Sequence, residues 1–125
     1  MIQGIGIDSI EVERIAAKIA KEQGFRELVF SPEEIKYCQS KAHPMEHFAA
    51  RFAAKEAFFK ALGTGWASGT AFSEIEILPD DKGKPRLHLL GQTAETLEPV
   101  HPWTIWVSLT HLSAVASAVV IIEQK

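Results

Sequence analysis

The chain has 125 residues, of which 46% are hydrophobic and 23% are charged, and its formal net charge is −3 at pH 7. This length predicts one domain over residues 1–125, and this composition excludes a disordered chain. The small negative charge gives no general attraction to nucleic acid, so we expect no nucleic-acid partner.

We expect the protein to work in the reducing cytoplasm. A single cysteine, Cys38, rules out an intrachain disulfide. The N-terminus lacks the basic segment and the cleavage pattern of a signal peptide. The longest apolar run, residues 114–122, is too short to span a bilayer, so we expect no membrane partner.

The N-terminal segment alternates isoleucine with glycine. Over residues 1–7 this pattern predicts a short buried strand with a close backbone approach at the glycines. We expect Asp8 to end the strand and, with Glu11, to form a capping box that opens a helix. That helix is predicted to run to about Gln23 and to end at a Gly24 cap.

The rest of the chain alternates short helices and strands. Ser31 and Glu34 match a second capping box, with Pro32 at the first helical position, and open a helix through Cys38. Strands are predicted at residues 72–78, 86–90, 103–109 and 115–122, with a turn at 80–85 and a helix at 92–98. This order favours an α+β fold with a mostly antiparallel sheet around a long central helix.

The central helix is predicted to begin near Met45, after Pro44, and to end at a left-handed Gly63 cap. At about 100° per residue, several of its side chains fall in one apolar stripe. The stripe contains Met45, Phe48, Phe52, Lys55 and Phe59. We therefore expect an amphipathic helix that buries this face.

A carboxylate shares this stripe, because Glu56 lies one turn after Phe52. Its desolvation is unfavourable unless a cation or a metal ion meets it. One interpretation is an i,i+4 ion pair with Lys60. The other joins Glu56 to Asp8 in a Mg²⁺ site, since two carboxylates leave room for water and phosphate ligands. Asp8 taken alone is better explained as a helix cap, and the metal site needs Glu56 as a second carboxylate at the same point.

Three cations, Arg51, Lys55 and Lys60, surround the same part of the helix. They are either solvated or, together with the backbone amides of Gly63 and Gly65, form a phosphate site. The spacing of a P-loop is absent.

His111 lies in a polar connection between two apolar strands, and is either a turn residue or a site residue. None of the five histidines shows a metal-ligand spacing such as HExxH. The chain therefore gives no indication of a zinc site.

These motifs together resemble the holo-[acyl-carrier-protein] synthase family, the small 4′-phosphopantetheinyl transferases. Residues 4–8 are similar to the opening motif of the family, and residues 51–65 to its central signature. Residues 83–85 and 108–111 match later landmarks in the same order, so the resemblance covers essentially the whole chain. His43 and His47 depart from the basic residues that relatives often carry there.

The resemblance implies transfer of 4′-phosphopantetheine from coenzyme A to a serine of acyl carrier protein, with release of adenosine 3′,5′-bisphosphate. It implies Mg²⁺ on Asp8 and Glu56. From the residues themselves we expect Glu56 and Lys60 to be catalytic, with Glu56 as the base that takes the serine proton directly or through water. The implied coenzyme A contacts are Arg51, Lys55, Lys60, Gly63, Gly65, Pro85, Thr110 and His111. A basic stripe on the first helix, formed by Arg14, Lys18 and Lys21, is expected to bind the acidic carrier.

Two other functions fit the same residues: a nucleotide-binding module without turnover, and a metal-dependent pyrophosphate hydrolase. Assembly is a further expectation. The strands at 103–109 and 115–122 are apolar on both faces, which predicts that both faces of their sheet are covered. Phe58 falls outside the apolar stripe and is either buried by another segment or exposed. With the resemblance, these features favour a homotrimer with coenzyme A sites between subunits.

Overall fold

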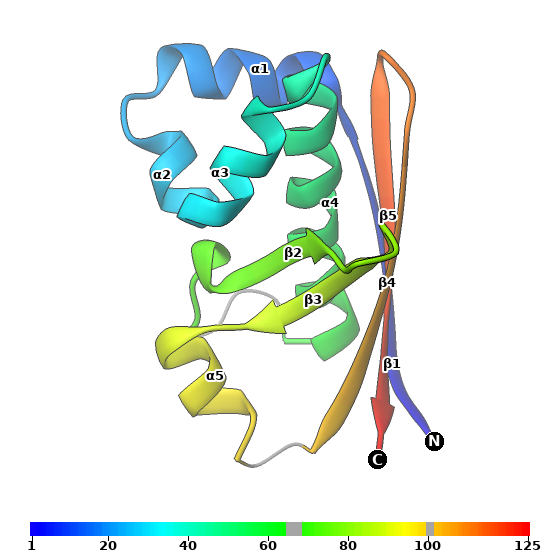
Figure 1. Cartoon of the computed structure of the whole chain (residues 1–125). Coiled ribbons are helices and arrows are strands. Elements are labelled where there is room, and N and C mark those ends of the chain that lie inside the picture. Colours follow the sequence, from blue (N-terminus) through cyan, green and yellow to red (C-terminus); the bar gives the residue numbers. More distant parts are fainter. Residues whose placement is uncertain (65–68, 100–101) are drawn as a thin grey trace.

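The computed structural model describes residues 1–64, 69–99 and 102–125 (Figure 1). Its elements are β1 (Ile2–Glu11), α1 (Val12–Lys21), α2 (Phe25–Val29), α3 (Pro32–Gln39), α4 (Pro44–Leu62), a 3₁₀ turn (Phe72–Glu74), β2 (Ile75–Pro79), β3 (Pro85–Leu89), α5 (Gly91–Leu97), β4 (Trp103–His111) and β5 (Val115–Gln124). Among the helices of these residues, none combines the length and apolarity needed to cross a membrane.

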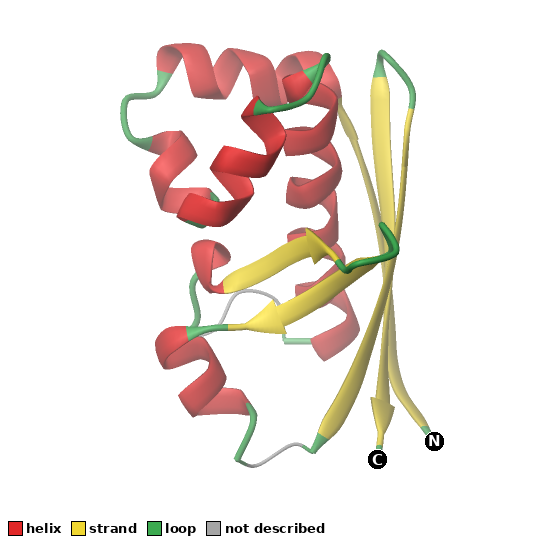
Figure 2. Cartoon of the chain, in the orientation of Figure 1, coloured by secondary structure: helices red, strands yellow, loops and turns green. Residues whose placement is uncertain are grey.

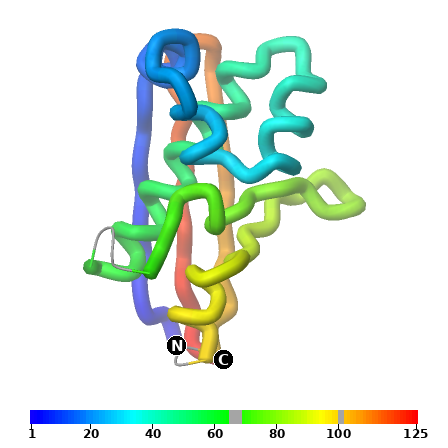
Figure 3. Tube along the Cα trace, turned by 90° about the vertical axis from the view of Figure 1, so that its left-hand side faces the viewer, coloured from blue at the N-terminus to red at the C-terminus, as the bar shows by residue number. Residues whose placement is uncertain are grey.

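The fold is built on α4 and a three-stranded antiparallel sheet in the order β1-β5-β4. Figure 2 shows the helices gathered on one side of this sheet. The short β2–β3 sheet and helices α1–α3 lie beyond α4, and the tip of the β2–β3 hairpin extends on the β4 side (Figure 3). The fold is therefore α+β and antiparallel, as the sequence predicts.

Helix α4 is buried on nearly all sides, with 11 of its 19 residues buried, so the expectation of one apolar stripe is wrong. The backbone at Ala57 and Ala61 lies against β1, while the rings of Phe48, Phe52 and Phe59 pack against Phe30, Phe25 and Phe72. Phe58 is 0% exposed and contacts the ring of Phe59. The physical reason is that α4 lies between two layers rather than on a surface.

Two glycines of β1 allow the close contact between α4 and the sheet. A Cβ atom on Gly6 would overlap the carbonyl oxygen of Ala57, and one on Gly4 would overlap that of Ala61. The alternation of the strand therefore places the glycines against the helix and turns Ile5 and Ile7 to the opposite face. The predicted close backbone approach is confirmed.

The free edge of β2 is closed by side chains instead of by another strand. The backbone N–H of Ile77 donates to Glu34 at 2.9 Å, and its carbonyl accepts from Arg51 at 3.1 Å. The carbonyl of Ile75 accepts from the Lys55 ammonium. Glu34 and Lys55 form an ion pair of 2.7 Å in which both side chains are 0% exposed. These bonds satisfy backbone groups that would otherwise be buried without partners.

The structure corrects the predicted start of the first helix. Asp8 does not cap it, because β1 continues to Glu11 and pairs there with Val115 of β5. Glu11 is the N-cap and makes no side-chain capping bond. Gly24 caps the short helix α2, which the sequence did not predict, rather than α1. Strand pairing with β5 satisfies the backbone at Asp8 and leaves its carboxylate available for other contacts.

Gly6→Ala is expected to abolish folding or to lower the thermal midpoint strongly, because the new methyl group overlaps backbone that cannot move independently. Gly83→Ala is the matched control. Gly83 has φ of 84° but open space around it, so only the left-handed conformation opposes the change, at about 1–2 kcal/mol. Circular dichroism melts of both variants make the comparison. Equal midpoints would contradict the close α4–β1 packing.

Candidate active site

Asp8, Glu56 and Lys60 form one cluster, which we call the Asp8 cluster, between β1 and α4. The Lys60 ammonium donates to the Asp8 carboxylate at 3.1 Å and to the Ile7 carbonyl at 3.0 Å. Asp8 is 19% exposed in this ion pair and Lys60 is 57% exposed, so the lysine reaches the site from solvent. Lys60 therefore forms its ion pair with Asp8 of β1 and not with Glu56 of its own helix.

The two carboxylates of the Asp8 cluster influence each other. Burial raises the pKa of Glu56, the Asp8 carboxylate raises it further, and the Lys60 ammonium opposes both effects. Glu56 is half-buried on α4, one turn before Lys60. A pair of close carboxylates with one lysine is a donor set suited to a hard divalent cation and to phosphate.

A second cluster lines a cavity of about 180 Å³ on the other side of α4, which we call the His111 cavity. Its walls include His47, Arg51, Gly83, Pro85, Leu109 and His111. Arg51 is 3% exposed, and its guanidinium lies 4.6 Å from the centre of the Tyr37 ring. Burial, followed by the charges of His111 and Arg51, lowers the pKa of His47. Cationic and imidazole groups thus converge on one small hollow.

The two clusters do not meet within the chain. Arg51 and Lys60 are nine residues apart in α4, which turns the helix by about 180° between them. Asp8 belongs to β1 and His111 to β4, which are the opposite edges of the three-stranded sheet. Within the chain, the two clusters are therefore separated by the width of the sheet and by α4.

Comparison with known proteins decides the family. The sequence profile of the 4′-phosphopantetheinyl transferase superfamily matches residues 4–118. A holo-[acyl-carrier-protein] synthase from Syntrophus aciditrophicus (strain SB) is 44% identical over 98% of this chain and 97% of its own length. The chain belongs to the holo-[acyl-carrier-protein] synthase family.

Solved structures of this family share the fold. The holo-[acyl-carrier-protein] synthase of Neisseria meningitidis superposes with a TM-score of 0.87 at 32% identity, covering 99% of this chain and 100% of that one. The synthase of Bacillus anthracis str. Ames in complex with CoA (3′,5′-ADP) gives 0.82 at 35% identity, covering 100% and 99%. Both similarities extend over the whole chain rather than over one motif.

The structure contradicts one expected site residue of the family signature. Lys55 was expected at the phosphates of coenzyme A, but its side chain is 0% exposed. Its ammonium donates to Glu34, to the Phe72 carbonyl at 2.8 Å and to the Ile75 carbonyl. Burial lowers the pKa of Lys55, while the Glu34 carboxylate opposes this. The lysine is a structural residue, because all of its donors are directed at protein oxygens.

The other expected coenzyme A contacts fall at different places. Arg51, Pro85 and His111 line the His111 cavity together. Thr110 faces a separate hollow on the opposite side of the sheet, which contains Ser108 and Ser117. Gly63 ends α4 in the predicted left-handed conformation, with φ of 80°, and is exposed. Gly65 lies outside the described residues.

Sequence reasoning missed an apolar surface beside the basic stripe. Arg14 and Lys21 are exposed on α1, whereas Lys18 pairs with Glu22 at 3.4 Å and lies over the Phe25 ring. Next to Phe25, the side chain of Leu28 is 74% exposed and lines a cavity of about 300 Å³ with Thr70, Ala71 and Phe72. The sequence gives only a weak indication of this apolar surface, because residues 25–29 form a helix too short to show a clear hydrophobic periodicity.

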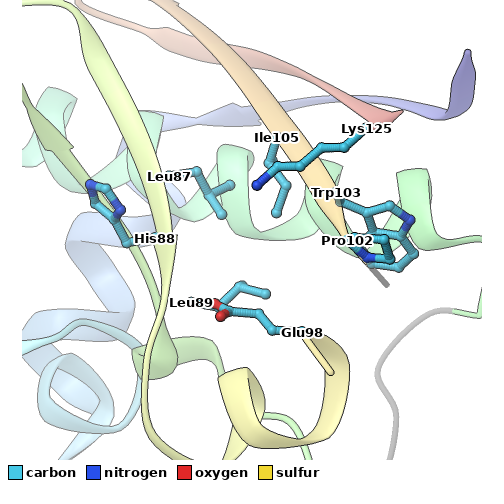
Figure 4. A pocket seen from close by; sticks show the side chains of 8 residues that line it. All are labelled: Leu87, His88, Leu89, Glu98, Pro102, Trp103, Ile105 and Lys125. Carbon is cyan, nitrogen blue, oxygen red and sulfur yellow. The ribbon is translucent and has the colours of Figure 1, made fainter. Parts of the chain in front are cut away.

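A further cavity, of about 290 Å³, opens between β3, α5 and β4 (Figure 4). Leu87, Leu89 and Ile105 form its apolar wall, and the charged ends of Glu98 and Lys125 approach from opposite sides. None of the predicted site residues lines it. We therefore place the candidate active site at the Asp8 cluster and the His111 cavity.

Lys55→Met is expected to lower the free energy of unfolding by about 3–5 kcal/mol, because it leaves the Glu34 carboxylate buried without its partner. Urea denaturation measures the loss. Lys60→Met is the matched control on the same helix, and should cost less than about 1 kcal/mol because Lys60 is exposed. A stable Lys55→Met protein with weakened coenzyme A binding would restore Lys55 as a phosphate ligand.

Proposed function

We propose that this protein transfers 4′-phosphopantetheine from coenzyme A to a serine of acyl carrier protein and releases adenosine 3′,5′-bisphosphate. The serine oxygen forms a bond to the phosphorus that carries pantetheine, and the bond from that phosphorus to the oxygen bridging the two phosphates breaks. The observation that carries the proposal is the Asp8 cluster, where Lys60 bonds Asp8 beside the half-buried Glu56. These residues belong to two family motifs that are far apart in the sequence.

The Asp8 cluster fits Mg²⁺. The described residues hold no group of three or more metal-ligating His, Cys, Asp or Glu side chains, so this part of the chain offers no complete cage. Mg²⁺ usually keeps waters and binds one or two carboxylates together with substrate phosphates. Asp8 and Glu56 would supply the two carboxylates. When bound, the ion would neutralise the pyrophosphate and the charge that develops on the leaving phosphate.

Lys60 and Glu56 of the Asp8 cluster would have separate roles in the transfer. Lys60 is solvent-exposed at its ammonium and reaches Asp8, so it is placed to hold a phosphate oxygen at the same point. Glu56 lies beside Asp8 and Lys60, so its carboxylate is placed to accept a proton at the same point. We assign Glu56 the role of general base, which accepts the proton of the carrier serine directly or through one water.

A homotrimer would bring the two clusters together. The sheet face opposite α4 exposes Ile5 by 61%, Ile7 by 65%, Trp106 by 41% and Val115 by 40%. Such an apolar face, uncovered by the described residues, is suited to burial against copies of itself in a closed ring. The site would then take the Asp8 cluster from one protomer and Arg51, Pro85 and His111 from its neighbour.

The carrier protein would dock on α1. Arg14, Lys18 and Lys21 form the basic stripe on this helix, and an acidic partner surface is its electrostatic complement. The adjoining cavity at Leu28 and Phe72 would receive apolar side chains of the carrier.

Incubation with coenzyme A and Mg²⁺, with and without an acyl carrier protein, tests the function by mass spectrometry. A transferase forms adenosine 3′,5′-bisphosphate only when the carrier is present, and the carrier gains one phosphopantetheine. A hydrolase would release the bisphosphate without the carrier. A nucleotide-binding module would bind coenzyme A and leave it intact.

Asp8→Asn and Glu56→Gln are each expected to reduce transfer at least about 100-fold, because each removes a charged oxygen ligand while keeping the side-chain shape. Calorimetry should also show weaker Mg²⁺ binding in the presence of coenzyme A. Glu95→Gln is the control, since Glu95 is exposed on α5. Normal turnover of either variant at low Mg²⁺ would exclude that residue as a ligand.

Arg14→Glu combined with Lys18→Glu is expected to raise the KM for the carrier about tenfold and to leave that for coenzyme A nearly unchanged. Added salt should raise the wild-type KM for the carrier in the same way. Lys36→Glu combined with Lys82→Glu reverses as many charges away from α1 and serves as the control. If the KM for the carrier changes neither with the Arg14 and Lys18 substitutions nor with added salt, this docking face is excluded.

Sedimentation at micromolar concentration is expected to give about three times 13.8 kDa. Ile5→Asp should dissociate the assembly and abolish transfer, because it places a charge in the proposed interface. Leu28→Asp places the same charge on an exposed residue of α2 and should leave the sedimenting mass unchanged. A monomer with full transferase activity would contradict the shared site.

A further inference from the structure

Glu46 and His111 form a contact that the sequence did not suggest. The Nδ1 atom of His111 lies 2.8 Å from the Oε1 atom of Glu46. Glu46 belongs to the first turn of α4 and His111 to the last residue of β4, so the contact joins positions 65 residues apart. The two side chains are 17% and 31% exposed, which shields the hydrogen bond partly from water.

The contact determines which ring nitrogen of His111 is available to a ligand. An ionised carboxylate only accepts hydrogen bonds. The Nδ1–H group of His111 therefore donates this hydrogen bond, and the Oε1 atom of Glu46 accepts it. The Nε2 atom is left without a hydrogen-bond partner among the described side chains. The ring of His47 packs edge-on at 4.9 Å and restricts rotation of the imidazole.

His111 lines the same cavity as Arg51 and Pro85, so its ring belongs to the site that would receive a phosphate group of coenzyme A. A carboxylate that accepts from one ring nitrogen of a histidine fixes the ring orientation, and the other nitrogen can donate to a phosphate oxygen when it also carries a proton. The carboxylate then affects ligand binding without touching the ligand.

We propose that Glu46 is a positioning residue: it accepts a hydrogen bond from Nδ1 of His111 and so directs the Nε2–H of the doubly protonated ring to a phosphate oxygen of coenzyme A. This inference rests on the proposed function, since it names a residue that serves the same site. Glu46 acts through His111 and not on the substrate.

A double-mutant cycle of Glu46→Gln and His111→Ala tests the proposal. In the wild-type background, Glu46→Gln is expected to lower kcat/KM about tenfold, within the range seen when a group that orients a histidine is removed. In the His111→Ala background, the same change should have almost no further effect, because the residue through which Glu46 acts is gone. Glu95→Gln, an exposed carboxylate on α5, is the matched control and should be neutral in both backgrounds.

Nitrogen-15 NMR of histidine-labelled protein supplies a readout that needs no turnover. The wild type should show His111 protonated at Nδ1, and Glu46→Gln should weaken or lose this signature while the protein remains folded. A wild-type ring protonated only at Nε2 would overturn the proposal. So would a Glu46→Gln effect of equal size in both backgrounds, which would show that Glu46 acts on the stability of α4 alone.

The two hypotheses fail separately. If the wild-type protein leaves the carrier unmodified, the proposed transferase function is wrong, and the NMR comparison still decides whether Glu46 holds His111. If transfer occurs and the cycle shows no coupling, the transferase function stands and the positioning role of Glu46 is excluded.

Discussion

The free edge of β2 is the constraint on which the rest of the structure depends. A strand edge that is buried against helices leaves backbone N–H and carbonyl groups without partners unless something replaces the missing strand. Here Glu34, Arg51 and Lys55 bond this edge at Ile75 and Ile77. The hairpin is thereby fixed to α3 and α4, and Pro85 is held opposite Arg51 in the His111 cavity.

The same helix supports the fold and the candidate site by the direction of its side chains. Lys55 and Glu56 are neighbours in the sequence but point about 100° apart. One closes the edge of β2, and the other faces Asp8. Arg51 contributes to both the fold and the candidate site. Its Nε–H group donates to the Ile77 carbonyl, and its side chain lines the His111 cavity. Charged residues in one short motif therefore have separate physical roles.

Local sequence rules succeeded where the partners are close along the chain. The second capping box is confirmed, with the Ser31 hydroxyl accepting from the N–H of Glu34 and the Glu34 carboxylate accepting from the N–H of Ser31. The left-handed Gly63 cap and the β2–β3 hairpin are also confirmed. The first capping box failed at Asp8 because pairing with β5 extends the strand to Glu11, and this pairing comes from a segment more than 100 residues away.

Glu34 shows how tertiary contacts add to a local role. The sequence identifies it as a capping residue, and it is one, but its carboxylate also accepts from Lys55 and from the backbone of Ile77. Likewise, a lysine beside a site glutamate in the sequence is a reasonable phosphate ligand, yet Lys55 points into the protein. Periodicity gives the angle of a side chain around a helix, but it does not say what lies in that direction.

The sequence by itself determined the α+β class, the family resemblance, the extent of the central helix and the residues that carry chemical groups. These follow from propensity, capping and motif spacing, which act over a few residues. Only the tertiary structure decided that Lys60 meets Asp8, that Lys55 is buried, and that Glu46 holds His111. It also separated the Asp8 cluster from the His111 cavity across α4. The reason is that these contacts depend on strand order and on which layer covers each face of the helix, and both are set by packing between distant segments.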